Sequence, residues 1–375
     1  MYHEKLTYET LPFDFSNYDA VGFATPSSAI YSIIQKVKQA SIFSKDTLLL
    51  AGGIHASIFP EQVIQDLGLD LVCIGEGEET LKEILSAQNR DFKKINGIVY
   101  RNGDSFVRTS PRAPIKDLDT LPLPARHLVP TDGIVQNFPL FDGITRKTSY
   151  IACSRGCNGN CAFCANLQKG IRYRSGGNIK EELQQLKKQY GIQSFFMYDS
   201  CFTTNKAKVK SICEAIKPLD LKWDVMAKAS DAEPEILAIM KDAGCSEIEF
   251  GIESGSQKIL DATNKRTTVE QNKKAIALAR EVGIKATALI IHGFPGEDDR
   301  STQETINFLE ETEPDRVLLS RFVPMPGSPI YMRIDKAMRP NNDDIFHFCK
   351  SAASNNKEID ASYARLAELA ESLNM

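Results

Sequence analysis

Three cysteines lie within eight consecutive residues, in the string Cys157-Asn-Gly-Asn-Cys161-Ala-Phe-Cys164. Thiolates at such close spacing are soft ligands that suit zinc or an iron–sulfur cluster. Three ligands from one short loop leave a metal position open, and a 4Fe-4S cube held in this way keeps one iron free for a further ligand. The spacing therefore indicates a metal centre with an open position, and an iron–sulfur cluster is the interpretation we favour over zinc.

The remaining cysteines fit a structural role better than a ligand role. Cys153 precedes the string by four residues and could supply a fourth ligand to zinc. It falls at or near the end of a strand, however, and we expect it to pack in the core. Most of the others lie in apolar patterns where free cysteines behave as small buried hydrophobic residues; these are Cys73, Cys201, Cys213, Cys245 and Cys349.

The elements around the cysteine loop predict an α/β barrel. From residue 148 onward, amphipathic helical patterns alternate with short strands, which we expect at Ser149–Ala152, Ser194–Tyr198, Lys222–Ala227, Glu247–Gly251, Lys285–Ile291 and Arg316–Phe322. Six strand–helix units over residues 148–331 predict a partial (β/α)6 barrel, short of the eight units of a closed one. Active sites of such barrels lie at the carboxyl ends of the strands, and the cysteine loop begins at the end of the first.

A smaller α/β region precedes the barrel. Residues 1–95 contain three buried-type strands separated by helical patterns, which predicts a truncated, doubly wound parallel sheet. Residues 96–147 combine a hairpin signal at Asn102-Gly103 with several prolines, and we expect them to form a linker. Residues 332–375 are expected to form a C-terminal helical tail.

Composition and charge narrow the function classes. Hydrophobic residues make up 42% of the chain and charged residues 25%, as in ordinary globular proteins. The formal net charge of −4 gives no electrostatic argument for a nucleic-acid partner or an anionic membrane. No segment approaches the roughly 18 apolar residues of a membrane span, and the N-terminus lacks an apolar signal core. We therefore expect a cytoplasmic protein with no membrane span and no nucleic-acid partner.

With Phe163 before its last cysteine, the string resembles the signature of the radical S-adenosylmethionine superfamily. Further motifs between about residues 18 and 331 resemble the branch that carries an N-terminal cobalamin-binding domain. They are Gly52-Gly-Ile-His-Ala56, Gly75-Glu-Gly-Glu-Glu79, Leu121-Pro-Leu-Pro124, Ser154-Arg-Gly-Cys157, Gly251-Ile-Glu-Ser-Gly255, Gly293-Phe-Pro-Gly-Glu297 and Pro324-Met-Pro-Gly-Ser-Pro329.

This resemblance implies an enzyme in which Cys157, Cys161 and Cys164 bind a 4Fe-4S cluster. The open iron would be chelated by the methionyl amine and carboxylate of S-adenosylmethionine. One electron, from a donor such as flavodoxin or ferredoxin, would cleave this cofactor to a 5′-deoxyadenosyl radical that abstracts hydrogen from a small organic substrate. The cofactor carries the difficult chemistry, and the protein positions it and excludes water.

The resemblance also implies cofactor-binding residues at the carboxyl ends of the strands. Phe163 is expected to approach the adenine, and the others are Tyr198, Asp199, Lys228, Glu253, Ser254 and His292. Two of them keep an alternative interpretation. Glu253 could be an acid that stabilises a helix N-terminus, and His292 could be a packing histidine inside the core.

Cobalamin binding stays open at this point, because the N-terminal sheet is shorter than the family's domain and the lower-ligand motif D-x-H-x-x-G is missing. Three hypotheses therefore remain. The first is a radical enzyme that uses cobalamin for methyl transfer or rearrangement. The second is a cobalamin-independent radical enzyme that performs dehydration, decarboxylation or cyclisation. The third is a non-catalytic iron–sulfur or zinc module.

Overall fold

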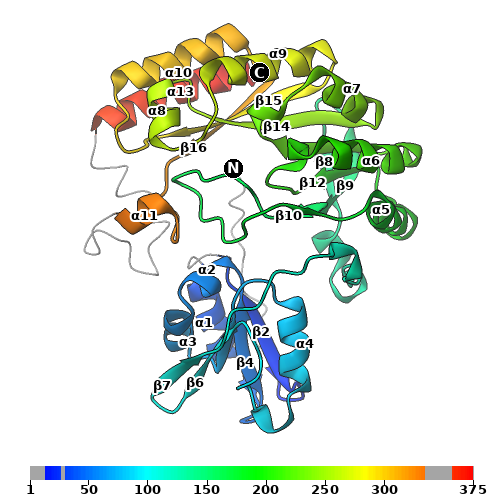
Figure 1. The fold of residues 1–375 in the computed structure, drawn as a ribbon, viewed down its shortest axis with the longest axis vertical. Helices are drawn as coiled ribbons and strands as arrows, with labels where there is room; N and C mark the ends of the chain where they lie inside the picture. Colours follow the sequence, from blue (N-terminus) through cyan, green and yellow to red (C-terminus); the bar gives the residue numbers. More distant parts are fainter. Residues whose placement is uncertain (1–12, 27–29, 334–356, 375) are drawn as a thin grey trace. The chain divides into compact units, whose positions relative to one another are not determined.

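The computed structural model describes residues 13–26, 30–333 and 357–374. The chain divides into two compact units, the first formed mainly by residues up to Ile115 and the second mainly by Lys116–Ile330 with the C-terminal helix. Each unit has a sheet of its own, and each is described by itself below (Figure 1). No helix in these described ranges combines the length and the apolar character that a bilayer span requires.

The first unit contains a five-stranded sheet in the order β2-β4-β5-β6-β7. Its parallel part confirms the predicted truncated sheet, with strands β2 (Ala20–Ala24), β4 (Leu48–Gly52) and β5 (Leu71–Cys73). The hairpin predicted at Asn102-Gly103 is formed by β6 (Ile98–Asn102) and β7 (Ser105–Arg108). Because β6 pairs antiparallel with β5, this hairpin extends the first sheet and does not lie in a separate linker.

Helices cover both faces of the first sheet, as expected for a doubly wound arrangement. Ala51 and Val72 pack toward α1 (Tyr31–Ala40) and α3 (Pro60–Leu67). Leu50 and Leu71 point to the opposite face, toward α4 (Glu78–Ser86). Burial on both faces explains why these strands read as continuous apolar runs and not as alternating ones. The short helix α2 (Ile54–Ile58) precedes α3, and β1 (Asp14–Phe15) pairs with β3 (Ile42–Phe43) beside the sheet.

The second unit contains a curled seven-stranded sheet in the order β16-β15-β14-β13-β12-β9-β8. The six strands predicted for the partial barrel are all present and parallel, namely β9 (Thr145–Ile151), β12 (Ser194–Met197), β13 (Lys222–Ala227), β14 (Cys245–Glu253), β15 (Lys285–His292) and β16 (Arg316–Arg321). Strand β8 (Gln136–Pro139), which pairs antiparallel with β9 at the sheet edge, is not among the predicted strands.

Helices lie along the outer side of the curled sheet (Figure 1). Several of their N-termini carry side-chain caps: Ser175 accepts from the Asn178 amide, and Thr268 and Asp298 form capping boxes. The helices of this layer are α5 (Gly176–Tyr190), α6 (Lys206–Ile216), α7 (Pro234–Asp242), α8 (Gln257–Ala262), α9 (Val269–Glu281), α10 (Asp299–Thr312) and α13 (Lys357–Leu373). A further short helix, α11 (Pro329–Arg333), follows β16 and is not part of this layer. Only α13 of the predicted C-terminal tail lies largely within the described residues.

Strand alternation separates the two faces of this sheet. In β13, Trp223, Val225 and Ala227 are buried against the helices, and the residues between them point to the inner face. Several large side chains on the inner face are exposed, among them Tyr150 (49%), Tyr198 (68%) and Leu318 (41%). The helix-covered face therefore forms the core. Ligands can bind on the inner face and at the carboxyl ends of the strands.

Candidate functional site

The cysteine loop leaves the sheet after β9 and is closed at its base by a short ladder. Strand β10 (Ser154–Arg155) pairs antiparallel with β11 (Arg172–Tyr173). Gly156 has φ 90°, and a Cβ there would lie 2.0 Å from the Gly170 carbonyl oxygen, so only glycine allows this crossing. The Cys157 amide donates to the Gln168 carbonyl (3.2 Å). The chain between 157 and 168 is therefore a closed loop with a fixed neck.

The three thiols of this loop lie close to one another. A Cβ at Gly159 would be 3.1 Å from Cys157 Sγ and 3.7 Å from Cys161 Sγ, so the glycine leaves room between them. Burial raises the pKa of Cys161 and that of Cys164, and charge on the neighbouring loop thiols raises both further. The described residues include no three His, Cys, Asp or Glu side chains that converge on a single ion. The thiols of a cluster bind separate iron atoms, so thiols that do not meet at one point are compatible with a cube.

The pKa of Cys157 is held at about 6, below its ordinary value, whereas burial alone would raise it. The largest cause is a contact with the thiol of Cys201, and the Gly159 amide adds a hydrogen bond. The positive charges of Lys228 and Lys265 lower the pKa further. These contacts favour the thiolate of Cys157, which is the form that binds metal.

The far side of the cysteine loop is fastened to the end of α8. Ala162 donates its amide to the Thr263 carbonyl (2.7 Å), and Asn264 Nδ2 donates to the Asn160 carbonyl (2.7 Å). The Phe163 ring lies 5.4 Å from that of Phe294. The loop is therefore tied to the elements that follow β14 and β15, beside the carboxyl ends of the strands.

Asp199 fastens the beginning of the loop. Its carboxylate accepts hydrogen bonds from the amides of Cys153 (3.1 Å) and Ser154 (2.5 Å) and from Ser154 Oγ (2.8 Å). The side chain is buried, and burial raises its pKa to about 6. We expected Asp199 to face the cofactor. The structure instead directs it at the backbone that leads into the cysteine loop, so it is a positioning residue.

Three of the predicted cofactor residues point to the inner face of the sheet. Tyr198 and Lys228 follow the inner-face alternation of β12 and β13 and are at least partly exposed. Glu253 lies on that face because it alternates with Ile252, which is buried in the helix-facing core. Their direct contact with a cofactor stays a prediction, and their positions agree with it.

Glu253 forms a buried ion pair with a lysine that the sequence analysis missed. Lys265 Nζ lies 2.5 Å from Glu253 Oε1, and the two side chains are only 10% and 9% exposed. Burial lowers the pKa of Lys265, but the Glu253 carboxylate outweighs this and raises it above the ordinary value. Glu253 also has φ 64°, a conformation that is costly for a residue other than glycine. Such strain and burial together are typical of functional positions.

The Ser254 hydroxyl is hydrogen-bonded within the protein and does not face an open space. Its hydroxyl contacts Thr305 Oγ1 on α10 (3.2 Å) and accepts from the Ser256 amide (3.1 Å). The next residue, Gly255, also donates its amide to Thr305 Oγ1 (3.1 Å). The predicted contact of Ser254 with the cofactor is therefore not supported, because the side chain holds the turn after Glu253 against α10.

His292 was expected either to contact the cofactor or to pack in the core, and its surroundings favour packing in the core. It shares the helix-facing alternation of Ala288 and Ile290, and it is buried. Its Nε2 lies 2.9 Å from Ser362 Oγ on α13, and its Nδ1 lies 3.2 Å from Glu297 Oε1. The second oxygen of Glu297 accepts from the amides of Gly293 and Phe294. His292 therefore supports the Gly-Phe-Pro-Gly-Glu turn from behind and does not face a ligand.

Cys153 lies in the hydrophobic core, fully buried, as expected for a packing cysteine. Lys265 and Cys201 are the residues at the site that sequence reasoning missed. Lys265 follows α8 in the polar stretch Thr263-Asn-Lys-Arg-Thr267, which has neither periodicity nor a motif. Cys201 sits in an apolar pattern that indicates packing. Only the fold brings either residue next to the cysteine loop.

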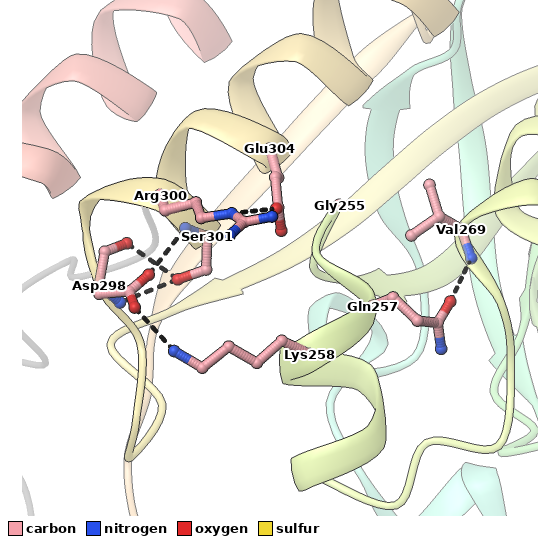
Figure 2. Close-up of a pocket in the computed structure, with 8 residues that line it drawn as sticks. All are labelled: Gly255, Gln257, Lys258, Val269, Asp298, Arg300, Ser301 and Glu304. Atoms are coloured by element: carbon pink, nitrogen blue, oxygen red, sulfur yellow. Dashed lines mark hydrogen bonds and ion pairs between the residues drawn. The ribbon is translucent and has the colours of Figure 1, made fainter.

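A separate pocket of about 530 Å³ lies on the helical side, between α8, the start of α9 and the start of α10 (Figure 2). Its charged side chains pair with one another: Lys258 with Asp298 (2.7 Å) and Arg300 with Glu304 (3.2 Å). Gln257 accepts from the Val269 amide (3.1 Å). Because these groups satisfy each other, the pocket offers no evident binding chemistry, and the cysteine loop is the better candidate site.

Comparisons with known proteins agree with this site. The radical SAM superfamily matches residues 151–309. An uncharacterised methyltransferase of Pyrococcus horikoshii is 32% identical over 321 residues, which cover 84% of this chain and 68% of that protein. An anaerobic magnesium-protoporphyrin IX monomethyl ester cyclase of Cereibacter sphaeroides is 28% identical over 84% of this chain and 53% of its own length.

Solved structures share the fold. The radical S-adenosylmethionine methyltransferase TsrM from Kitasatospora setae, solved with cobalamin and a 4Fe-4S cluster, superposes with a TM-score of 0.68 at 20% identity, over 85% of this chain and 65% of that one. This chain thus spans between 53% and 68% of the length of these three proteins. The shared sequence and the cysteine loop show that the chain belongs to the radical S-adenosylmethionine superfamily, enzymes that use a 4Fe-4S cluster and S-adenosylmethionine.

Proposed function

We propose that this chain holds its 4Fe-4S cluster through Cys157, Cys161 and Cys164 and binds S-adenosylmethionine beside it at the carboxyl ends of the strands. The observation that carries the proposal is the position of the three thiols, on one closed loop directly after the first parallel strand. Bound there, the cluster supplies the electron that cleaves S-adenosylmethionine. The chain itself supplies the thiolates, the fixed neck of the loop and the charges around it.

Each residue near the cysteine loop suits a different part of S-adenosylmethionine. Glu253 offers a carboxylate that can accept hydrogen bonds from an ammonium group or from ribose hydroxyls. Lys265 pairs with that carboxylate and holds it in place, and Lys228 presents a cation to a ligand carboxylate. Phe163 offers a ring to the adenine, and its packing on Phe294 restricts its movement. These roles need no rearrangement of the strand ends.

The substrate is a small organic molecule that occupies the inner face of the sheet. Tyr150, Tyr198 and Leu318 leave exposed apolar surface there, which suits a molecule with an apolar or ring portion. The reducing electron comes from a donor protein such as flavodoxin or ferredoxin. Cys164, the exposed member of the triad, marks the side of the loop nearest to solvent.

The test is anaerobic reconstitution with iron and sulfide, followed by reduction with dithionite and addition of S-adenosylmethionine. We expect a brown cluster, an electron paramagnetic resonance signal after reduction, and release of 5′-deoxyadenosine and methionine. Separate Cys157→Ala, Cys161→Ala and Cys164→Ala variants should lose the chromophore. Cys213→Ala is the matched control, because Cys213 is buried in the core far along the chain from the loop. Any triad variant that kept full iron content and full cleavage would refute the proposal.

Methyl transfer with cobalamin is the second proposal, and it is favoured by the methyltransferases among the relatives and by the cobalamin in the TsrM structure. The first unit supports it with three parallel strands whose carboxyl ends carry Gly53 and Gly75, both at positive φ. Ligands of open α/β sheets bind at such strand ends. The alternative is a radical enzyme without cobalamin, such as a cyclase, which the first unit's short sheet favours.

Equilibration with hydroxocobalamin and gel filtration separates these two proposals. Cobalamin use predicts a corrinoid spectrum that stays with the protein in about equal amount to the chain. Complete loss of the corrinoid on the column, with 5′-deoxyadenosine formation unaffected, would favour the cobalamin-independent alternative.

A further inference from the structure

A fourth thiol lies against the cysteine loop. Cys201 Sγ is 3.2 Å from Cys157 Sγ. Cys201 follows β12, and Cys157 follows the neighbouring parallel strand β9, so the loops after two adjacent strands bring these residues together. Neither the spacing of the triad nor the superfamily match assigns a role to Cys201.

Both partners of this contact have a fixed backbone. The Tyr173 hydroxyl donates to the carbonyls of Cys201 (3.2 Å) and Phe202 (3.1 Å), and the Phe202 ring packs on Trp223. On the other side, Asn166 Nδ2 donates to the Cys157 carbonyl (2.8 Å). The hydrogen-bonded backbone on both sides therefore holds the two sulfur atoms next to each other, and no loop movement is needed to bring them into contact.

The distance is close to that of a bond. A disulfide joins its sulfur atoms at about 2.04 Å, so these two must approach by only about 1 Å. The eight cysteines within the described residues are all free. Cys213 and Cys245 are buried in the core, where neither oxidants nor iron reach them easily. Cys157 is half-buried and accessible, which oxidation requires.

We propose that Cys157 and Cys201 form a reversible disulfide when the loop carries no cluster. Each thiol loses one proton and one electron as the sulfur–sulfur bond forms. A two-electron oxidant such as hydrogen peroxide accepts the two protons and two electrons and is reduced to two molecules of water. A dithiol reductant reverses the step by exchange. The disulfide keeps the Cys157 sulfur from over-oxidation, which is irreversible. It also removes one of the three ligands, so the loop cannot accept iron until it is reduced.

The disulfide itself follows from the contact, and its effect on cluster loading rests on the proposed function. In the loaded protein the Cys157 sulfur is bound to iron and is no longer available as a thiol. Cluster loading and disulfide formation therefore compete for one sulfur atom. The disulfide is therefore the state of the cluster-free chain, either after synthesis or after cluster loss, and its reduction precedes the next cluster loading.

The experiment maps disulfides in the full chain after removal of iron with a chelator under reducing conditions. The reductant is removed, hydrogen peroxide is added, free thiols are alkylated, and peptides are identified by mass spectrometry without reduction. We expect the peptides of Cys157 and Cys201 to be joined, with a loss of two hydrogen atoms from the intact mass. Dithiothreitol should restore both thiols. A linkage dominated by Cys157 with Cys161 or Cys164, or no linkage at all, would overturn the proposal.

Two variants separate this inference from the cluster assignment. Cys201→Ser should form no such linkage, and after peroxide treatment followed by dithiothreitol it should load less iron than the wild type treated in the same way, because its Cys157 is open to irreversible over-oxidation. Cys164→Ser, the matched control, should keep the linkage, because it leaves the pair intact. If Cys201→Ser regained iron loading as fully as the wild type, the inference would be wrong. If the linkage formed but the reduced wild type loaded no iron, the cluster proposal would fail while the disulfide stood.

Discussion

The buried pair of Glu253 and Lys265 gives the most demanding test of the site. Its two side chains are about nine-tenths buried, with Nζ and Oε1 2.5 Å apart. Removing one partner of such a pair leaves an uncompensated charge and costs about 3–5 kcal/mol, against about 0–1 kcal/mol for an exposed pair. We therefore expect Lys265→Met to destabilise the second unit by about 3–5 kcal/mol. The double variant with Glu253→Gln, which removes both charges, should recover most of that loss.

The assay is denaturant unfolding of the iron-free, reduced protein followed by tryptophan fluorescence. The chain has a single tryptophan, Trp223, which is fully buried in the second unit. Its signal therefore reports on the unit that contains the ion pair, even if the two units unfold separately. Lys285→Met is the matched control, because Lys285 pairs with Asp315 but is half exposed. This control should lose no more than about 1 kcal/mol.

Two results would contradict this reasoning. A loss below about 1 kcal/mol in Lys265→Met would mean that the pair is as well solvated as a surface pair. A double variant no more stable than the single one would mean that lost packing, and not an unpaired carboxylate, causes the effect. In either case the assignment of Lys265 as the buried ion-pair partner that holds Glu253 in place would be wrong.

Two further predictions concern buried carboxylates. Asp199→Asn turns a donor toward the Cys153 and Ser154 amides, which should cost about 1–3 kcal/mol and lower the iron bound per chain on reconstitution; unchanged iron content would remove its positioning role. Burial raises the pKa of Glu247 to about 7 from an ordinary 4.5, so its contribution to stability is present below pH 4.5 and is lost as the pH rises through 7, by up to about 3 kcal/mol. Glu247→Gln should flatten that part of the profile of melting temperature against pH, and an unchanged slope would contradict the assignment.

The fold was predictable from the sequence because the strands of this chain have strong local signals. β13 begins and ends where expected, at Lys222 and Ala227, and the other parallel strands differ by a few residues at their ends. The cysteine loop was predictable for the same reason, since its ligands lie within one short string. The antiparallel strands β6, β7 and β8 were misplaced or missed, because strand pairing depends on partners far along the chain.

The site residues show where local signals stop. Tyr198 and Asp199 are neighbours in sequence, yet one points to the inner face and the other into the core, because successive side chains of a strand alternate. The same alternation turns His292 toward the helices. Alternation with the buried Ile252 places Glu253 on the inner face, and the string Gly-Ile-Glu-Ser-Gly by itself does not show which of its side chains faces inward.

The amino-acid sequence by itself predicted the candidate ligand set and determined the order of strands and helices and membership of the superfamily, because all three depend on residues close together in the chain. Tertiary structure alone decided that Lys265 neutralises Glu253 and that Cys201 meets Cys157. Cys157 and Cys201 come from loops after two adjacent parallel strands, and they meet only when these strands bring their carboxyl ends to one edge. Glu253 ends β14 and Lys265 follows α8, so this pair meets where the chain returns past the end of β14.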